Sequence, residues 1–467
     1  MTDLPSRFER TATAAEVTAR YAHLGPGEES GDEVAVAGRV MLMRPQGRLA
    51  FAELRDSSGA VQLFALAAHT ERFDEFTRLR LGDWVGSRGE VVRTRRGELS
   101  VKVRHFDLLA EARRSFGDKW RGVSDVETRF RQREVDLWAN ERSRHVLLLR
   151  SRLVQRLRER LWAEGFVEVE TPILHPVPSG GDARHFTTRH LALDADFYLR
   201  VAPELYLKRL VVGGFEKVFE IGRLFRNEGL SPRHNPEFTT VELYQAYADY
   251  VDLMALVEQL VASLATDLLG TTRLTYQGRE LDLTPPWRRA TMAELVSESV
   301  GVPVSVHSDP AELARLLRAA GGDPAPGWGP GKLLAELYEQ TTESKLFDPV
   351  FVRDYPTEVS PLARPHPADP ALVERFEAIV AGRELVNAFS ELTDPDEQRA
   401  RLEAQAAARA AGDEEAMALD EPFLRALEHG LPPTAGLGLG IDRLTMLFTD
   451  SANIREVIAF PTLRPER

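Results

Sequence analysis

Two regions with different spacing of apolar residues divide the chain. Between residues 34 and 109, short runs of alternating apolar and polar positions are separated by glycine, proline and charged residues. This pattern predicts β-strands. The expected strands cover residues 34–40, 49–54, 61–65, 84–91 and 99–103. Five short strands that follow one another so closely favour a small closed barrel.

Segments of a different kind flank this barrel region. Residues 14–21 have a weak helical period, which Gly25, Pro26 and Gly27 interrupt. An OB-fold, a five-stranded barrel that binds single-stranded nucleic acid, fits a barrel placed before a larger domain. Residues 1–30 are expected to form a helical and linker segment, residues 31–112 the OB-fold domain, and residues 113–145 a second linker.

Residues 146–467 are expected to form the larger domain, with helices and strands mixed. They lack the glycine-rich phosphate loop of nucleotide-binding folds built on parallel sheets. Four elements stand out: an amphipathic helix, a strand that ends at a proline, a small helical insertion and an alanine-rich helix with one solvated face. The amphipathic helix is predicted over residues 147–157 and the strand over 165–172. The helical insertion is predicted over residues 301–345 and the alanine-rich helix over 403–411.

Composition limits the class of protein. With 467 residues, of which 43% are hydrophobic, the chain can form two or three domains with cores of their own. It has no apolar run of membrane-spanning length, and its first ten residues lack the apolar centre of a secretory signal, so a cytoplasmic protein without a membrane partner is expected. The absence of cysteine excludes disulfides and thiolate chemistry. Any metal would therefore have oxygen or imidazole ligands, which favours magnesium over structural zinc.

The net charge of -13 is unusual for a protein that binds nucleic acid. The distribution of charge matters more than the sum, because residues 88–104 carry six basic side chains against two acidic ones. These charges fit a basic surface on the barrel. They equally fit an edge strand protected from aggregation.

The block from Phe225 to Tyr244 contains the most informative chemistry of the chain. Arginine presents a planar fork of donors to phosphate and keeps its charge, so Arg226 suits an α-phosphate that becomes more negative during attack. Arg233 and His234 are placed to reach the outer phosphates. Such a charge cluster also fits a solvated hairpin tip with surface ion pairs.

The same block offers an aromatic face and acidic side chains. Phe238 presents a flat apolar ring to a purine. Residues 240–244 alternate in polarity, so Glu242 and Tyr244 would point from the same face of a strand. Together with the arginines, these residues predict a pocket for a nucleotide and an amine.

The segment 225–250 resembles motif 2 of the class II aminoacyl-tRNA synthetases, in the form typical of lysyl-tRNA synthetases. Other segments are similar to the same family, namely 202–214, 358–363, 382–392 and 436–444. The resemblance implies an α+β fold in which an antiparallel sheet flanked by helices follows the OB-fold. The helix, strand and proline over 147–172 resemble motif 1, which forms dimers in this family. A homodimer is therefore expected.

The resemblance also implies an ATP site with Mg²⁺. Adenylate formation needs an in-line carboxylate nucleophile, a divalent cation and cationic donors. Glu377 and Glu384 match the family's magnesium ligands, and Arg226 and Arg443 its catalytic arginines. The residues expected to bind ATP are Arg226, Glu228, Arg233, His234, Phe238, Glu377, Glu384 and Arg443.

The amino-acid pocket is expected to bind a cation. Buried ammonium groups need carboxylate partners, and the resemblance places Glu242, Tyr244, Asn387, Phe389 and Glu391 around the side chain, with Gly180 and Glu204 at the α-amino group. Aspartyl- and asparaginyl-tRNA synthetases share the layout, but an aspartate substrate would need basic residues here. Asp182 departs from the family's run of small residues: it either pairs with Arg184 or reshapes the amine site towards a lysine analogue.

The barrel would read the anticodon. The resemblance implies that Phe51 would stack on a base and that Gln62 and Glu98 would form hydrogen bonds with base edges. A phenylalanine in a strand is also an ordinary core residue. The expected partners are tRNA(Lys), ATP and L-lysine, with no DNA.

The sequence therefore predicts a lysine–tRNA ligase that acts through lysyl-adenylate. One alternative is a specialised paralogue that activates lysine or an analogue for an acceptor other than tRNA. The other is a tRNA-binding or regulatory protein with an inactive catalytic domain, against which the presence of Arg226, Glu377, Glu384 and Arg443 counts.

Overall fold

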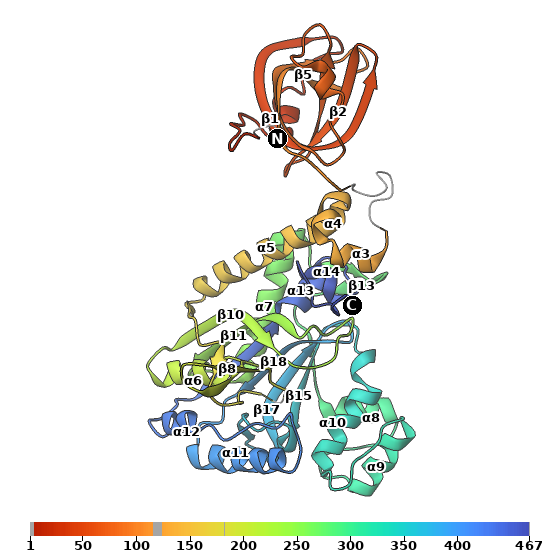
Figure 1. Ribbon diagram of the computed structural model, residues 1–467. Coiled ribbons are helices and arrows are strands. Elements are labelled where there is room, and N and C mark those ends of the chain that lie inside the picture. The colour runs from red at the N-terminus through yellow and green to blue at the C-terminus, as the bar shows by residue number, and fades with distance from the viewer. Residues whose placement is uncertain (1–3, 115–123, 182, 467) are drawn as a thin grey trace. The chain divides into compact units, whose positions relative to one another are not determined.

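The computed structural model describes residues 4–114, 124–181 and 183–466. Figure 1 shows its elements. The chain divides into two compact units, Met1–Glu141 and Arg142–Arg467. Asp182 and residues 115–123 of the expected linker lie outside the described part.

The first unit is built on a closed five-stranded barrel, which confirms the predicted OB-fold. Its neighbouring strands alternate between buried and more exposed positions, so one face of each strand fills a core that includes Leu63, Val91 and Val101. The pairs are antiparallel except for β3 with β5. In the order of pairing, the strands are β1 (Glu29–Gln46), β2 (Leu49–Arg55), β3 (Ala60–Leu66), β5 (Leu99–Ala110) and β4 (Trp84–Arg93).

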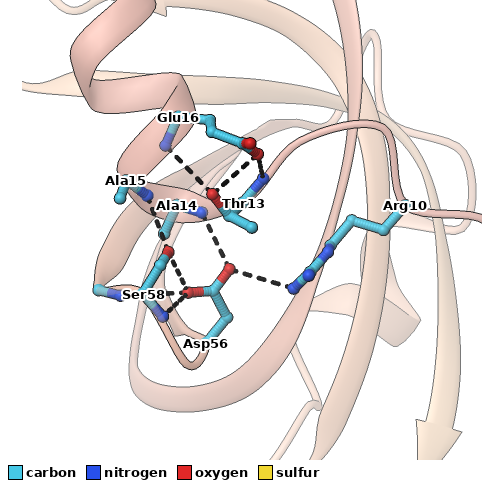
Figure 2. A network of polar contacts seen from close by, with 8 residues as sticks. Arg10, Thr13, Ala14, Ala15, Glu16, Asp56 and Ser58 are labelled. Atoms are coloured by element: carbon cyan, nitrogen blue, oxygen red, sulfur yellow. Dashed lines mark hydrogen bonds and ion pairs between the residues drawn. The ribbon is translucent and has the colours of Figure 1, made fainter. Parts of the chain in front are cut away.

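A network of hydrogen bonds attaches the N-terminal helix α1 (Ala14–Arg20) to the barrel (Figure 2). Thr13 and Glu16 form a capping box, and Asp56 in the β2–β3 loop accepts a hydrogen bond from the Ala14 N–H at 2.9 Å. Asp56 also accepts bonds from the Ser58 hydroxyl at 2.6 Å and N–H at 2.7 Å. Residues 14–21 were expected to be helical, and the capping chemistry explains where the helix begins.

Three short helices complete the first unit. They are α2 (Phe73–Phe76), α3 (Val126–Arg131) and α4 (Arg133–Ala139). Phe76 of α2 is fully buried, and its ring meets that of Phe106 edge-on at 5.3 Å. Asp125 caps the start of α3 by accepting a hydrogen bond from the Thr128 N–H at 2.7 Å.

The second unit is built around a large, mostly antiparallel sheet flanked by helices, as the fold prediction had it (Figure 1). Only its two edge pairs, β14 with β15 and β6 with β10, are parallel. The short strand β16 (Pro365–His366) pairs beside β17. From one edge to the other, the strands are β14 (Arg288–Thr291), β15 (Val350–Pro356), β17 (Asp369–Ile379), β18 (Glu384–Ser390), β19 (Thr434–Gly440), β11 (Glu237–Ala246), β10 (Lys217–Phe225) and β6 (Val167–Glu168).

Apolar residues on one face of this sheet form the main core with two long helices. In β19, Leu437 and Leu439 are buried in this core, whereas the alternating Gly436, Gly438 and Gly440 face the other way. In β11, Val241 and Leu243 are likewise buried in the main core. The helices are α5 (Glu141–Ala163) and α7 (Tyr250–Leu269), whose leucines at helical spacing pack into the same cluster.

Between the parallel strands β14 and β15, the chain forms a separate helical group with its own core. In Figure 1 this group lies beside β15. Its helices begin at Met292, nine residues before the start of the insertion expected from sequence. They are α8 (Met292–Val300), α9 (Pro310–Ala319), α10 (Pro330–Thr341) and the 3₁₀ helix η1 (Glu343–Lys345).

Shorter elements close the second unit. The strand expected over residues 165–172 is reduced to β6, because only Val167 and Glu168 pair with β10. The others are β7 (Leu174–His175), β8 (Thr187–His190), β9 (Ala195–Leu199), β12 (Arg273–Tyr276), β13 (Arg279–Asp282), η2 (Thr357–Val359), α6 (Glu204–Val212), α11 (Pro395–Ala410), α12 (Glu421–Leu427), α13 (Ile441–Phe448) and α14 (Ile454–Val457). In the described residues, no helix is long and apolar enough to cross a membrane.

Candidate active site

A cavity of about 440 Å³ lies on the face of the large sheet opposite the main core. It gathers residues from distant parts of the sequence, which the central strands bring to one surface. All the residues expected to bind ATP and lysine line it, with the exception of Glu391. These are Gly180, Glu204, Arg226, Glu228, Arg233, His234, Phe238, Glu242, Tyr244, Glu377, Glu384, Asn387, Phe389 and Arg443.

Strand register explains how the cavity floor is assembled. Glu377, Asn387, Gly438 and Glu242 are direct neighbours across β17, β18, β19 and β11. Because side chains alternate along a strand, residues of one such row point to the same face of the sheet. This row therefore carries carboxylates at both ends and an amide between them.

A second row lies two residues further along the same strands. It contains Arg375, Phe389, Gly436 and Tyr244. A Cβ atom at Gly436 would lie 2.3 Å from both Glu391 Oε1 and Tyr244 Cε1. Gly436 is therefore needed for the approach of these two side chains.

The loop between β10 and β11 supplies the basic side of the cavity. Arg226 follows the last residue of β10, and its guanidinium lies 5.4 Å from the ring centre of Phe238 on β11. His234 Nδ1 lies 3.0 Å from the Ser231 hydroxyl. Burial lowers the pKa of His234, and the neighbouring Arg443 lowers it further, so this ring is neutral at physiological pH.

Arg443, in the first turn of α13, is held by Glu384. Its Nη1 donates to the backbone carbonyl of Glu384 at 2.5 Å and to Oε2 of the same residue at 3.1 Å. Burial raises the pKa of the Glu384 carboxyl, but Arg443 and then Arg226 outweigh it and lower the pKa below its ordinary value. Glu384 therefore carries its charge.

Glu377 and Glu384 offer an oxygen site that fits Mg²⁺. Burial raises the pKa of Glu377 to about 7, and the negative charge of Glu384 adds to this rise. Two carboxylates that repel each other across a cavity are the arrangement that a hard cation stabilises. In the described part of the chain, no group of three histidine or acidic residues could hold a metal. Two carboxylates fit Mg²⁺, which keeps waters and substrate phosphates as its other ligands.

Arg375 is a site residue that sequence reasoning missed. Its guanidinium donates to Glu377 Oε1 at 2.7 Å and to Asn387 Oδ1 at 3.0 Å. It thus fixes the orientation of two predicted side chains. Its position two residues before Glu377 on one strand, and so on the same face, was the available signal.

The acidic end of the cavity is deeply buried. Burial raises the pKa of Glu242 to about 8, and the negative charge of Glu204 adds to this rise. Burial and the same neighbouring carboxylates raise the pKa of Tyr244 well above its ordinary value, so its hydroxyl stays protonated. Among the described residues, Glu242 forms no ion pair within 4.0 Å.

Glu391 is the one predicted residue that does not line the cavity. Its carboxylate is buried on the side of Gly436 that faces the cavity and pairs with Lys208, whose Nζ also donates to Glu204 Oε1 at 2.7 Å. The sequence analysis missed Lys208. Its place four residues after Glu204, one turn along α6, would have put the two on the same helix face.

Near the predicted α-amino contact, Gly180 has a φ of 96°, a left-handed conformation that favours glycine. The proposed pairing of Asp182 with Arg184 falls on a residue outside the described part. Arg184 itself lies 3.2 Å from Glu414.

The residues expected to read the anticodon lie on the barrel. Phe51 and Phe64 are opposite each other in β2 and β3, and their rings stack at 5.1 Å on the outer face of the strands. Gln62 is half-buried, and its Oε1 has no hydrogen-bond partner among the described residues. Glu98 is exposed next to the start of β5. Phe51 is thus not a barrel-core residue.

A closed OB barrel followed by an antiparallel sheet with this row of acidic, amide and glycine positions defines a class II aminoacyl-tRNA synthetase. The chain belongs to that family. Residues 125–464 match the model of the tRNA synthetases class II (D, K and N), and residues 34–109 match the OB-fold nucleic acid binding domain.

Curated relatives are similar to the chain over nearly its whole length. A lysine–tRNA ligase of Prochlorococcus marinus (strain MIT 9303) is 52% identical over 472 aligned positions, which cover 98% of this chain and 93% of the relative. A lysine–tRNA ligase of Synechococcus sp. (strain CC9605) is 53% identical with the same coverage. One from Nostoc sp. (strain PCC 7120 / SAG 25.82 / UTEX 2576) is 50% identical over 98% of this chain and 84% of the relative.

Proposed function

We propose that the chain is a lysine–tRNA ligase, which activates L-lysine with ATP and transfers it to the 3′ end of tRNA(Lys). The observation that carries the choice of amino acid is the acidic end of the cavity, where Glu204 and Glu242 line the wall and the buried Glu391 shares Lys208 with Glu204. An aspartate side chain would meet repulsion there, whereas an ammonium would be stabilised. The names of the relatives support the same choice.

Activation is assigned to the basic half of the cavity. The carboxylate of lysine attacks the α-phosphorus and pyrophosphate leaves. Arg226, the first residue of the β10–β11 loop, is placed to stabilise charge on the α-phosphate. Phe238, whose ring lies next to the Arg226 guanidinium, offers that ring to adenine. Arg443, oriented by Glu384 before any substrate arrives, contacts the outer phosphates together with Arg233 and His234.

Glu377 and Glu384 would hold Mg²⁺ on the phosphates. When bound, the metal neutralises the charge of the triphosphate and orients it. Arg375 keeps Glu377 in place through the bond at 2.7 Å. Glu228, which also lines the cavity, belongs to the proposed ATP site.

The lysine side chain is assigned to the acidic half, where Glu242, Tyr244, Asn387, Phe389 and Glu391 surround it. Gly180 and Glu204 take the α-amino group. A specialised paralogue would need a different acceptor, but the barrel with Phe51, Gln62 and Glu98 on its surface supports tRNA as the acceptor. A cytoplasmic location and the absence of a DNA partner, both expected from the sequence, belong to the same proposal.

A homodimer is part of this proposal, and exposed apolar residues support it. On α5, Leu148 and Trp162 are about half exposed, and the segment that follows the helix exposes Val167 in β6, Leu174 in β7 and Ile173 just before β7. Large apolar side chains gathered on neighbouring segments mark an interaction surface.

Pyrophosphate exchange tests the proposal. With ATP and Mg²⁺, lysine should support exchange far better than aspartate, asparagine, ornithine or β-lysine, and removal of Mg²⁺ should abolish it. The variant Arg226→Ala should lose at least about a hundredfold in rate, the scale of removing one preorganised donor. Exchange that prefers aspartate or β-lysine would overturn the choice of amino acid.

A further inference from the structure

The ion pairs of Lys208 form a feature that the proposed chemistry does not explain. The Lys208 side chain is fully buried, and its ammonium contacts two carboxylates, that of Glu204 on the cavity wall and that of the buried Glu391. Its Nζ also lies 5.5 Å from the ring centre of Phe389 and 5.8 Å from that of Phe423. The protein has thus placed an ammonium of its own beside the pocket proposed for an ammonium substrate.

The charges around this pocket have a definite sum. Glu204, Glu242 and Glu391 supply three carboxylates, and Lys208 supplies one ammonium. When all three carboxylates are ionised, two negative charges remain, and this equals the number of ammonium groups in lysine. An amino acid with a neutral side chain supplies one ammonium fewer, so one of the three carboxylates must then hold a proton or remain buried without a partner, and a buried unpaired charge is costly.

Lys208 also favours the charged form of Glu391. Burial raises the pKa of Glu391 well above its ordinary value, and Lys208 is the group that opposes this rise most strongly. Burial lowers the pKa of Lys208, but Glu204 and Glu391 outweigh burial and raise it, so the ammonium remains charged. The other titratable groups that face Glu391 are Glu204, Glu242 and Tyr244, and none of them supplies positive charge.

We propose that Lys208 is a positioning residue that determines amino-acid specificity: its buried ammonium contacts both Glu204 and Glu391 and favours the charged form of these carboxylates, so that the pocket disfavours amino acids with a neutral side chain. The inference rests on the proposed lysine activation. Without Lys208, the neutral form of Glu391 becomes more favourable, and binding of a neutral side chain then leaves less unpaired charge.

The test compares lysine with its neutral isostere 6-hydroxynorleucine in ATP–pyrophosphate exchange by the full-length enzyme. In Lys208→Met, the ratio of kcat/KM for lysine to that for the isostere should fall at least about tenfold relative to wild type. Because both substrates are measured on one preparation, the fraction of active enzyme cancels from the ratio. The KM for ATP should remain within about twofold of its wild-type value.

Matched variants separate charge from packing. Lys208→Arg keeps the positive charge and should keep the wild-type ratio, while Lys208→Gln removes the charge and should repeat the fall even if the methionine variant does not fold. Lys217→Met makes the same chemical change at a lysine outside the cavity, where Nζ donates to the Glu164 carbonyl at 3.0 Å, and should leave the ratio unchanged.

The outcomes distinguish the inference from the function on which it rests. If the wild-type enzyme shows no lysine-dependent pyrophosphate exchange, the proposed function itself is wrong. A wild-type enzyme that prefers lysine, with an unchanged ratio in Lys208→Met and Lys208→Gln, would overturn only the role of Lys208. Loss of exchange by the same factor with both amino acids would mean that Lys208 only supports the structure.

Discussion

Glu242 shows how a single buried carboxyl links affinity to pH. Its pKa of about 8 means that at neutral pH the empty pocket holds a proton there, which must leave before an ammonium can pair with the carboxylate. Lysine affinity should therefore rise with pH, by up to about tenfold per unit, and level off above about pH 8. The KM for lysine in pyrophosphate exchange measures this effect, with the KM for ATP as a control. A lysine KM that is independent of pH below about pH 8 would contradict it.

The variant Glu242→Gln should gain stability while it loses function. The carboxyl ionises near 4.5 in the unfolded chain and near 8 in the fold, so the folded state holds the extra proton between these values. Its contribution to the free energy of unfolding is therefore complete below pH 4.5 and decreases as the pH rises towards 8. Glutamine cannot ionise, so the variant does not lose this stability at high pH, and its Tm at about pH 8 should be several degrees above that of the wild type. Lysine-dependent pyrophosphate exchange should fall at least about a hundredfold. At about pH 4 the Tm of the two proteins should converge, and a constant difference at all pH values would argue against this cause.

Strand β19 makes the cavity possible at the level of an element. Its glycines face the cavity and its leucines face the core, so the strand supplies a floor without side chains. The glycines differ in what surrounds them, because a Cβ at Gly436 would lie 2.3 Å from Glu391 and Tyr244, whereas at Gly438 the nearest atom is 3.6 Å away.

This difference gives a matched pair of variants. Gly436→Ala should lower the free energy of unfolding by about 1–3 kcal/mol, the usual cost of overpacking, whereas Gly438→Ala should change it by less than about 1 kcal/mol. Chemical denaturation of both variants without substrate is the measurement. Equal destabilisation would show that strand propensity, and not contact with Glu391 and Tyr244, sets the cost.

The attachment of α1 to the barrel depends on Asp56. Burial raises the pKa of this carboxyl, but hydrogen bonds from Ser58 and the Ala14 N–H lower it more, so its contribution to stability is present above an ordinary pKa of 3.8 and is lost as the pH falls below it. Asp56→Asn should destabilise the first unit by about 1–2 kcal/mol. Hydrogen exchange should show faster opening of α1, while pyrophosphate exchange stays at the wild-type rate. Unchanged protection of the Ala14 amide would contradict this role.

At the scale of the whole molecule, the two units carry separable parts of the proposed reaction. Every residue assigned to ATP and lysine lies within Arg142–Arg467, and Phe51, Gln62 and Glu98 lie within Met1–Glu141. Phe51→Ala in the full chain should therefore leave lysine-dependent pyrophosphate exchange unchanged and reduce aminoacylation of tRNA(Lys) at least about fivefold, because base stacking on an aromatic side chain contributes about 1–3 kcal/mol. Phe76→Leu, a change in the barrel core, is the control for general damage to the unit. A parallel loss of exchange in Phe51→Ala would contradict the separation.

The amino-acid sequence alone determined which elements form and which chemistry they carry. Alternating apolar positions specified the five barrel strands and the face of β11 that bears Glu242 and Tyr244, because side-chain direction in a strand follows directly from spacing. The motif resemblance supplied the antiparallel sheet and the candidate residues of the cavity. Periodicity could not supply the order of strands, since that order depends on contacts between distant segments.

Only the tertiary structure decided how these groups act on one another. It joined Glu377, Asn387, Gly438 and Glu242 into one row, because strands β17, β18, β19 and β11 pair in that register. It also placed Lys208 between Glu204 and Glu391, whose carboxylate is buried on the side of Gly436 that faces the cavity. Charge and pKa depend on distance and burial in three dimensions, which a linear pattern does not contain.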